Sequence, residues 1–329
     1  MTENASIQIA AGTELSRQVR GVAAATRPIT PRITAAYDAS SITFRVLRAF
    51  GWGPLLNLGY YPFGPPLTVL NFVTTPFIFA PFFRLPGAQL KLVTKSASLL
   101  RLTRGSRVLD VGCGRGMSSF FMAHAFPLAD ITALDLLPQN VATAQTLYGN
   151  TPNLTYLEGD AMDLRFPSES FDRVLCLEAA FHFPDRNRFL GQLARITQPG
   201  ARVVIVDFMS KADRDAPAWN DPKIEVVRQT WQWEYFDSAR QYQLNAVKNG
   251  FHVEACRDWS AHVTAPLGTV FELVAWLARR RWGRRLLLQQ NPLLRSLSDQ
   301  DWEDFTQSAH AHRYLEKHAS YIALILTRS

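Results

Sequence analysis

The chain has 329 residues, of which 47% are hydrophobic and 19% are charged, and its formal net charge is +7. This length allows a full α/β core with an added extension or cap, and the composition excludes an intrinsically disordered chain. The basic residues are spread along the sequence apart from one dense run at 279–285, so the charge is weak evidence for a nucleic-acid partner.

The cysteines and the first residues bear on the cellular compartment. Cys113, Cys176 and Cys256 are odd in number and widely spaced, which predicts neither a disulfide framework nor a metal-binding knuckle. Residues 1–35 are rich in Ala, Thr, Ser and Arg without the continuous apolar stretch of a secretory signal, so we expect a flexible tail. Both features favour a cytoplasmic location.

Residues 36–104 are expected to form a helical lid. Within them, residues 67–85 (LTVLNFVTTPFIFAPFFRL) are apolar and nearly long enough to span a bilayer, which takes about 20 residues. Pro76, Pro81 and Arg84 interrupt the stretch. A lid that faces the substrate or touches a membrane is therefore favoured over a spanning helix.

Residues 105–210 alternate short β-branched runs with helical stretches, which is typical of right-handed βαβ units and a parallel sheet. We expect strands at 107–111, 131–136, 154–158, 171–177 and 202–207, and helices at 118–125, 139–148 and 187–196. Pro199 and Gly200 are expected to form a turn between the last helix and its strand. The pattern predicts a doubly wound, Rossmann-like α/β sheet with its ligand-binding loops at the carboxyl ends of the strands.

Residues 211–329 are expected to complete the sheet and to add a cap. Residues 250–259 and 321–327 have the pattern of strands, and the insertion between them, 261–317, is far longer than a hairpin loop. Seven of the eight tryptophans lie between Trp219 and Trp302, which predicts a helical, aromatic cap. The basic and apolar segment 271–288 indicates either a solvated helix face or contact with an anionic membrane surface. His310 and His312 are expected on a solvated helix face, and no metal site is predicted.

The segment VLDVGCGRG, which begins at Val108, predicts a buried strand followed by a glycine turn and a helix. A dinucleotide fingerprint would need glycine at position 117, where Met117 stands. Asp110 beside the turn suits the cationic ammonium and sulfonium of S-adenosylmethionine, whereas it would repel a pyrophosphate. No GK[ST] follows, which excludes a P-loop, so S-adenosylmethionine is the favoured cofactor.

The next strands place further acidic residues at the same edge of the sheet. Asp135 ends the second expected strand, where a carboxylate can accept hydrogen bonds from both ribose hydroxyls, and Leu136 can pack on the adenine. Asp160 follows the third strand and can approach the adenine amino edge. Glu178 follows the fourth strand, ahead of His182 at the mouth of the expected cleft.

On these motifs the core resembles the class I S-adenosylmethionine-dependent methyltransferases of the small-molecule subgroup. It is most similar to rebeccamycin-type sugar O-methyltransferases, tocopherol methyltransferases and phthiotriol-lipid methyltransferases. The resemblance implies a seven-stranded sheet in which three glycines wrap the methionine part of the cofactor, Asp135 holds the ribose, and Asp160 with Ala161 holds the adenine. The three glycines are Gly112, Gly114 and Gly116.

The resemblance also implies roles outside the glycine turn. Residues 56–61 (LNLGYY) are similar to an N-terminal segment of the family in which an aromatic residue, here Tyr61, closes over the cofactor. The segment from Glu178 resembles the family's E-x-x-H-H-x-P-D-R, with Phe181 at the first histidine, so His182 alone is the candidate catalytic base. Asp207 matches an acidic catalytic position, and an aspartate beside an imidazole would fix its tautomer. Transfer by proximity without a base stays open.

These features together predict O-methylation of a lipophilic small molecule, a secondary metabolite or a lipid, in a pocket below the aromatic cap. C-methylation of an isoprenoid or aromatic ring stays open, because aromatic side chains can stabilise a carbocation. A nucleic-acid methyltransferase is disfavoured, because an NPPY or PC motif is expected after the fourth strand, where this chain has EAAF. A non-catalytic lipid-binding protein with the same fold is a further alternative.

Overall fold

The computed structural model describes residues 42–49, 52–53, 55–62, 65, 85–212, 216–233 and 237–329. The expected tail at 1–35 lies outside the described residues, as does the apolar segment 67–85 apart from its last residue.

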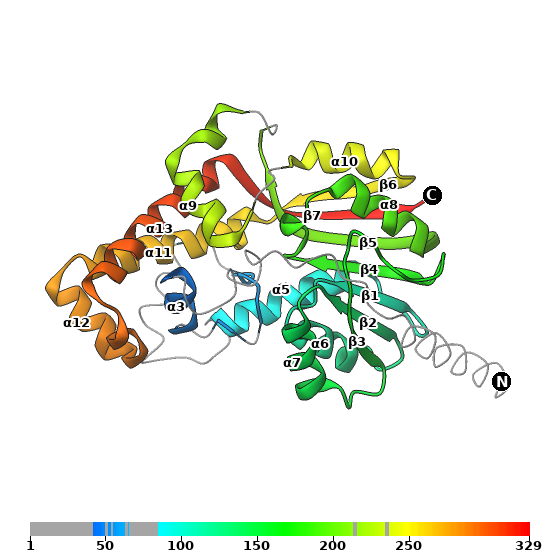
Figure 1. Ribbon diagram of the computed structural model, residues 1–329, viewed down its shortest axis with the longest axis horizontal. Helices are drawn as coiled ribbons and strands as arrows, with labels where there is room; N and C mark the ends of the chain where they lie inside the picture. Colours follow the sequence, from blue (N-terminus) through cyan, green and yellow to red (C-terminus); the bar gives the residue numbers. More distant parts are fainter. Residues whose placement is uncertain are drawn as a thin grey trace.

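The seven strands form one sheet with the order β3-β2-β1-β4-β5-β7-β6 (Figure 1). The strands are β1 (Arg107–Val111), β2 (Asp130–Asp135), β3 (Leu154–Glu158), β4 (Phe171–Leu177), β5 (Thr197–Ser210), β6 (Phe251–Asp258) and β7 (Ala319–Arg328). β1 to β5 pair in parallel, and β7 runs antiparallel between β5 and β6. The expected Rossmann-like, seven-stranded sheet is confirmed.

The strand order changes direction between β1 and β4. From β1 the chain moves outward through β2 to β3, and it then returns to pair β4 with the other side of β1. The loops that follow β1 and β4 therefore leave the sheet in opposite directions, which opens a crevice at the carboxyl ends of the strands. A ligand-binding site is expected at this point of the sheet.

Helices cover both faces of the sheet, so its central strands bury side chains on two sides. α5 (Leu85–Leu99), α6 (Met117–Ala125) and α7 (Pro138–Tyr148) form one layer, and α8 (Arg186–Ile196) and α10 (Ala239–Lys248) form the other (Figure 1). β5 illustrates the alternation: Val204 and Val206 belong to the core that contains α5, whereas Val203 and Ile205 belong to the core under α8.

The other long helices of the described residues build a cap beyond the end of the sheet (Figure 1). They are α3 (Ile42–Ala49), α9 (Pro222–Trp231), α11 (Thr264–Ala278), α12 (Arg281–Gln290) and α13 (Asp299–His318), with short 3₁₀ turns η3 (Pro217–Asn220), η4 (Ser260–His262) and η5 (Pro292–Ser296). As expected, the stretch from η4 to α13 is inserted between the paired strands β6 and β7. A capping box of Ser298 and Asp301 fixes the start of α13.

The helices of the expected N-terminal lid have different neighbours. α3 is held to α13 by a hydrogen bond of 2.7 Å between the Thr43 and Ser308 hydroxyls and by the Arg45–Asp301 ion pair, also 2.7 Å long. α5 instead packs on β4 and β5. Residues from both ends of the sequence therefore make up one cap.

Two local expectations were wrong. Pro199 and Gly200 do not precede the strand, because Thr197 already pairs with Phe171, and the turn becomes a bulge before the pairing of Arg202 with Arg173. His312 does not lie on a solvated face, because its Nε2 accepts a hydrogen bond from the Trp231 indole in the cap, although His310 is exposed. Within the described parts of the chain, no helix combines the length and hydrophobicity that a membrane crossing requires.

Candidate functional site

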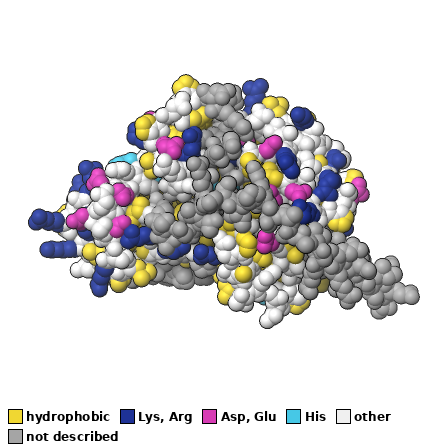
Figure 2. Space-filling model, viewed as in Figure 1, with side chains coloured by type: hydrophobic (Ala, Val, Ile, Leu, Met, Phe, Trp, Pro, Cys, Tyr) yellow, Lys and Arg dark blue, Asp and Glu magenta, His cyan; other side chains and the backbone are white. Residues whose placement is uncertain are grey.

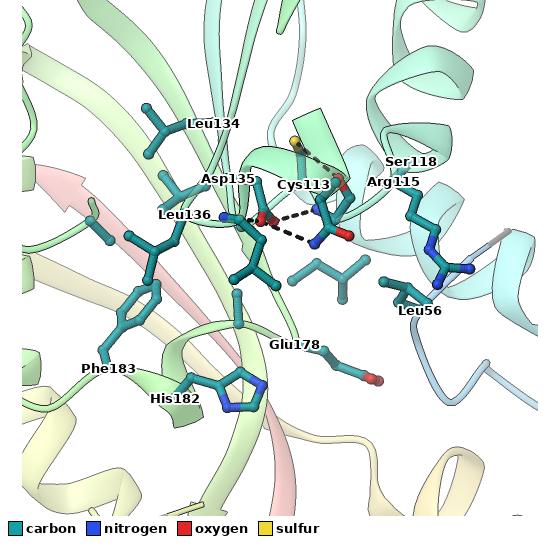
Figure 3. A pocket seen from close by; sticks show the side chains of 18 of the residues that line it. Leu56, Cys113, Arg115, Ser118, Leu134, Asp135, Leu136, Glu178, His182 and Phe183 are labelled. Atoms are coloured by element: carbon teal, nitrogen blue, oxygen red, sulfur yellow. Dashed lines mark hydrogen bonds between the residues drawn. The ribbon is translucent and has the colours of Figure 1, made fainter. Parts of the chain in front are cut away.

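A cavity of about 210 Å³ lies at the carboxyl ends of β1 to β4, in the crevice between β1 and β4 (Figure 3). Its walls come from the loops after these four strands and from residues 55–57, which approach from the N-terminal part. The residues that line it are Leu55, Leu56, Asn57, Val111, Gly112, Cys113, Gly114, Arg115, Met117, Ser118, Leu134, Asp135, Leu136, Leu137, Asn140, Gly159, Asp160, Ala161, Met162, Leu177, Glu178, Ala179, His182, Phe183 and Pro184.

Glycine is required at position 112 for two reasons. Its φ of +75° is in the left-handed region, and a Cβ there would lie 2.3 Å from the Cβ of Ala179. The loops after β1 and β4 therefore touch at this point. The backbone of Gly112 and Gly114 lines the cavity, as the sequence predicts for a turn that lets a ligand lie against bare main chain.

Gly116 and Asp110 were expected at the cofactor, but neither lines the cavity. A Cβ at Gly116 would lie 2.5 Å from the Cβ of Ala144, and the Tyr156 hydroxyl donates a 2.7 Å hydrogen bond to the Gly116 carbonyl. Asp110 accepts a 2.6 Å hydrogen bond from Ser119, and burial raises its pKa to about 6. Both residues hold the start of α6 against the sheet, so they stabilise the glycine turn without facing the cavity.

Asp135 lies in the wall of the cavity, as expected, but most of its hydrogen-bonding capacity is used within the protein (Figure 3). Oδ2 accepts from the Gly114 N–H at 2.8 Å, and Oδ1 accepts from the Leu137 N–H at 2.9 Å and from the Asn140 amide at 3.1 Å. A carboxylate has about four acceptor sites, so roughly one remains for a ligand. The carboxylate therefore has fewer acceptor sites left than the two hydrogen bonds that the sequence predicted for it.

The other residues that were expected to contact the adenine also line the cavity. Leu136, Asp160 and Ala161 line the cavity, and Asp160 Oδ1 accepts a 2.9 Å hydrogen bond from the Met162 N–H. Gly159 was not predicted as a site residue, although a Cβ there would lie 2.5 Å from Leu134 Cδ1. The sequence signal for Gly159 was its position directly after the third strand, before Asp160. A larger residue there would collide with Leu134 in the wall of the cavity.

Glu178 lines the cavity and also binds the N-terminal segment next to it. Its backbone has a φ of +49°, and its carboxyl group accepts hydrogen bonds from the Leu58 N–H at 3.1 and 3.2 Å and from the Tyr321 hydroxyl at 2.6 Å. Burial raises the pKa of Glu178 to about 8. Glu178 thus ties the N-terminal segment to the sheet as well as facing the cavity.

The N-terminal residues that cover the cavity are Leu55, Leu56 and Asn57 rather than Tyr61. The Gln89 amide of α5 donates to the carbonyls of Leu55 at 2.9 Å and Asn57 at 2.5 Å. Tyr61 does not line the cavity, because its backbone is bound to His262 of η4 through hydrogen bonds of 2.7 and 3.0 Å. The segment 56–61 therefore reaches the cavity as the sequence predicted, but through Leu56 and Asn57 at its start, whereas the expected contact residue Tyr61 lies away from the cavity.

His182 lines the cavity next to Phe183, on the short turn η2 (Ala180–His182) (Figure 3). Burial lowers the pKa of His182 to about 3, and a hydrogen bond with the backbone of Gln232 opposes that shift. The imidazole is therefore neutral at pH 7. A neutral imidazole can accept a hydrogen bond from a hydroxyl group, which the candidate base requires.

Asp207 is fully buried and does not line the cavity. Its carboxyl group accepts hydrogen bonds from the N–H groups of Phe181 at 2.9 Å and Phe208 at 2.7 Å, and burial raises its pKa to about 7. Arg186 Nη2 donates to the Phe181 carbonyl at 2.9 Å. Asp207 was expected to pair with the imidazole, but it binds the N–H of Phe181 instead, while Arg186 binds the carbonyl of the same residue. These two contacts position the turn that carries His182.

A second cavity of about 50 Å³ lies in the cap and was not predicted in detail. It is lined by Leu58, Phe181, Phe208, Trp231, Trp233, Thr264, Leu267, Gly268, Phe271, His312, Leu315, Glu316 and Ala319. Most of these side chains are aromatic or aliphatic. Burial raises the pKa of Glu316 to about 7, although Arg313 lies 2.5 Å away.

The two cavities share a thin wall. His182 lines the first cavity and Phe181 lines the second, and their ring centroids are 3.8 Å apart. In the same way, Asn57 lines the first cavity and its neighbour Leu58 lines the second. A polar, glycine-lined cavity and an apolar, aromatic one therefore meet at the turn that Asp207 positions.

A crevice at the switch point of this sheet, lined by a glycine turn and an acidic residue at the end of β2, is typical of the class I methyltransferases. Residues 109–205 match the family model described as a methyltransferase domain. Residues 109–205 are therefore a methyltransferase domain of the class I, S-adenosylmethionine-dependent kind, and S-adenosylmethionine is the cofactor of this domain.

Curated relatives agree with this assignment, and a solved structure agrees with the fold. The chain is 31% identical over 228 residues to a 2-methyl-6-phytyl-1,4-hydroquinone methyltransferase of Synechocystis, and the match covers 69% of this chain and 65% of the relative. It is 29% identical to a 27-O-demethylrifamycin SV methyltransferase of Amycolatopsis mediterranei over 72% of this chain and 79% of the relative. The fold is similar to a geranyl diphosphate C-methyltransferase of Streptomyces coelicolor, solved with S-adenosyl-L-homocysteine, with a TM-score of 0.63 at 13% identity over 92% of this chain and 100% of that one.

Proposed function

We propose that the protein transfers the methyl group of S-adenosylmethionine to a hydroxyl group of a lipophilic small molecule. The observation that carries the proposal is that a glycine-lined cavity and an aromatic one lie side by side at His182 and Phe181, whose ring centroids are 3.8 Å apart. Methyl transfer needs a polar site for the cofactor and an acceptor site that meet at one point and exclude water.

The residues of the first cavity fit the cofactor. Gly112 and Gly114 present bare backbone for the methionine part, and Asp135 has roughly one acceptor site left for a ribose hydroxyl. Leu136, Asp160 and Ala161 would bound the adenine. When bound, S-adenosylmethionine supplies an electrophilic methyl group on a sulfonium centre.

The second cavity is the proposed acceptor site. Its aromatic and aliphatic lining favours an apolar ring or chain, because burying such a group releases water from both surfaces. The names of the two curated relatives contain a phytyl hydroquinone and a rifamycin, both large and partly apolar molecules. We infer a phenolic lipid, polyketide or terpenoid as the acceptor class.

His182 is proposed to orient the acceptor hydroxyl and to accept its proton as the new bond forms. An imidazole with a pKa of about 3 is a weak base, so most of the rate enhancement would come from holding the hydroxyl close to the methyl group in a dry site. Asp207 acts through Phe181 and is a positioning residue in this scheme.

The test has two stages. Calorimetry with S-adenosylmethionine should show micromolar binding that Asp135→Ala abolishes, whereas Asp163→Ala, which removes an exposed carboxyl from the loop after β3, should leave it unchanged. The protein is then incubated with methyl-labelled S-adenosylmethionine and a panel of alkylresorcinols, alkylhydroquinones and fatty acids. Nuclear magnetic resonance of the labelled product should show a methoxy carbon, and binding without any label transfer to such acceptors would contradict the proposal.

The aromatic lining of the second cavity also favours a second candidate, C-methylation of an isoprenoid or aromatic ring. Phe181, Trp231, Trp233 and Phe271 could stabilise a carbocation formed when a double bond attacks the methyl group. The same labelling experiment separates the two reactions, because C-methylation would give a methyl carbon bonded to carbon in the product.

A further inference from the structure

The outer end of the cap carries an unusual run of positive charge. Between Glu272 and Asp299 the chain contains six arginines and no acidic residue. Four of the six side chains are exposed: Arg279, Arg281, Arg285 and Arg295. Figure 2 shows basic side chains grouped at this end of the molecule, where α12 lies in Figure 1.

Large apolar side chains are exposed in the same run. Trp276 is 46% exposed, Trp282 56%, Leu286 41% and Leu293 69%. They are four of the eight large hydrophobic side chains that are exposed among the described residues, and the other four belong to the sheet domain. Exposed apolar groups that gather at one place usually mark an interaction surface.

The apolar and basic side chains lie beside each other on α11, α12 and η5. The rings of Trp276 and Trp282 pack edge to face with centroids 5.6 Å apart, and the Arg280 guanidinium lies 3.9 Å from the Trp276 centroid. On α12, Trp282 and Leu286 are one helical turn apart. Arg281 and Arg285 are also one turn apart, and each immediately precedes one of these two apolar residues in the sequence. We call these exposed side chains the basic tip: Trp276, Arg279, Arg281, Trp282, Arg285, Leu286, Leu293 and Arg295.

The acidic residues nearest to the basic tip in sequence on either side are Glu272 and Asp299. Glu272 pairs with Arg313 of α13, and Asp299 pairs with Arg284, which is not one of the exposed arginines of the tip. The four exposed arginines of the basic tip are therefore the dominant charge on α12 and its flanks.

We propose that the basic tip docks on the surface of an anionic lipid bilayer. Tryptophan and leucine insert into the headgroup boundary, while arginines beside them contact lipid phosphates, so this combination fits a charged lipid surface. A nucleic-acid site would instead need a continuous basic stripe that follows a backbone, and the apolar centre of the tip would then remain exposed to water.

The same helix connects the basic tip with the second cavity. Leu267, Gly268 and Phe271 of α11 line that cavity, and Trp276 lies little more than one turn further along. Docking would therefore hold the proposed acceptor cavity close to a membrane in which lipophilic molecules dissolve. The docking itself does not depend on methyl transfer.

Flotation with lipid vesicles tests the proposal, using the full chain without cofactor. The protein should float with vesicles of phosphatidylcholine and 30% phosphatidylglycerol and remain at the bottom with phosphatidylcholine alone. Each basic side chain near an anionic surface contributes about a fivefold change in partitioning, so Arg281→Gln with Arg285→Gln should weaken binding about 25-fold. Trp282→Ser with Leu286→Ser should also reduce flotation.

The matched control removes two exposed charges from α10, which lies at the far end of the molecule: Arg240→Gln with Lys248→Gln should change binding less than threefold (Figure 1). All four positions of the tip variants are exposed, and calorimetry with S-adenosylmethionine checks that each variant is folded. Equal loss in control and tip variants, flotation with neutral vesicles, or no flotation would overturn the proposal. Self-association that Trp282→Ser with Leu286→Ser abolishes, without vesicle binding, would overturn it in favour of a second copy.

Discussion

Replacing Gly112 by alanine tests the contact between the loops that follow β1 and β4. Gly112 has a φ of +75°, and an added Cβ would lie 2.3 Å from the Cβ of Ala179, well inside van der Waals contact. Gly105 is the matched control, because its φ is +79° but a Cβ there would meet no atom within 4 Å. The two variants share backbone strain and differ in steric overlap.

The expected losses of stability follow from the backbone strain and the steric overlap. An alanine in the left-handed region costs about 1–2 kcal/mol, so Gly105→Ala should lower the free energy of unfolding by that amount. Overpacking adds about 1–3 kcal/mol, so Gly112→Ala should lose about 2–5 kcal/mol in total. Ala179 lines the first cavity, and its displacement should weaken cofactor binding about tenfold or more, because errors in placement near a ligand are costly.

Urea denaturation measures the stability of both variants, and calorimetry with S-adenosylmethionine measures their affinity. Gly105→Ala should bind the cofactor like the unmodified protein. If Gly112→Ala were no less stable than Gly105→Ala, or bound S-adenosylmethionine equally well, the steric argument would be refuted.

Three further outcomes are expected. His182→Ala should lower kcat about 100-fold with KM for S-adenosylmethionine unchanged; a loss under threefold would show that proximity alone suffices. Glu178 has a folded-state pKa of about 8, above its ordinary value of 4.5, so the folded form retains a proton and loses stability as pH rises between these values. From pH 6 to pH 8, urea denaturation should show about 2 kcal/mol more loss in the unmodified protein than in Glu178→Gln, and parallel curves would contradict the pKa. Phe271→Ala in the second cavity should raise KM for a lipophilic acceptor about tenfold and leave cofactor affinity unchanged; the reverse pattern would remove the acceptor assignment.

The fold was largely predictable because the periodic patterns are strong. The strand at 321–327 is buried along most of its length and is marked by a continuous apolar sequence, and the run at 107–111 is marked by its β-branched and aliphatic residues before the glycine turn. Pro199 and Gly200 misled the prediction of the β5 boundary, since a turn dipeptide can also be accommodated as a bulge within a strand.

The sequence predicted which loops form the site, but not which of their side chains face the cavity. Spacing places Asp110 and Gly116 at the correct edge of the sheet, but only the three-dimensional packing of α6 shows that they face away from the cavity. Asp207 was expected beside the imidazole, because it matches an acidic catalytic position in the family that the sequence resembles. The Phe181 peptide occupies its carboxyl group instead, and backbone partners leave no trace in a sequence.

The aromatic cavity could not be located from composition alone. The tryptophan count predicted a cap, but Trp231 and Trp233 line the cavity whereas Trp276 and Trp282 point outward. Helix orientation decides between these two positions, and it depends on contacts such as that between Thr43 and Ser308, which are 265 residues apart.

The placement of the cap between β6 and β7 has a consequence for how such a protein can diversify. These two strands are paired to each other, so their ends stay fixed whatever chain connects them. The insertion supplies most of the proposed acceptor cavity, whereas the cofactor cavity is built by strands on the other half of the sheet. A different insertion at this one junction can therefore change the accepted molecule while the methyl donor site is inherited intact.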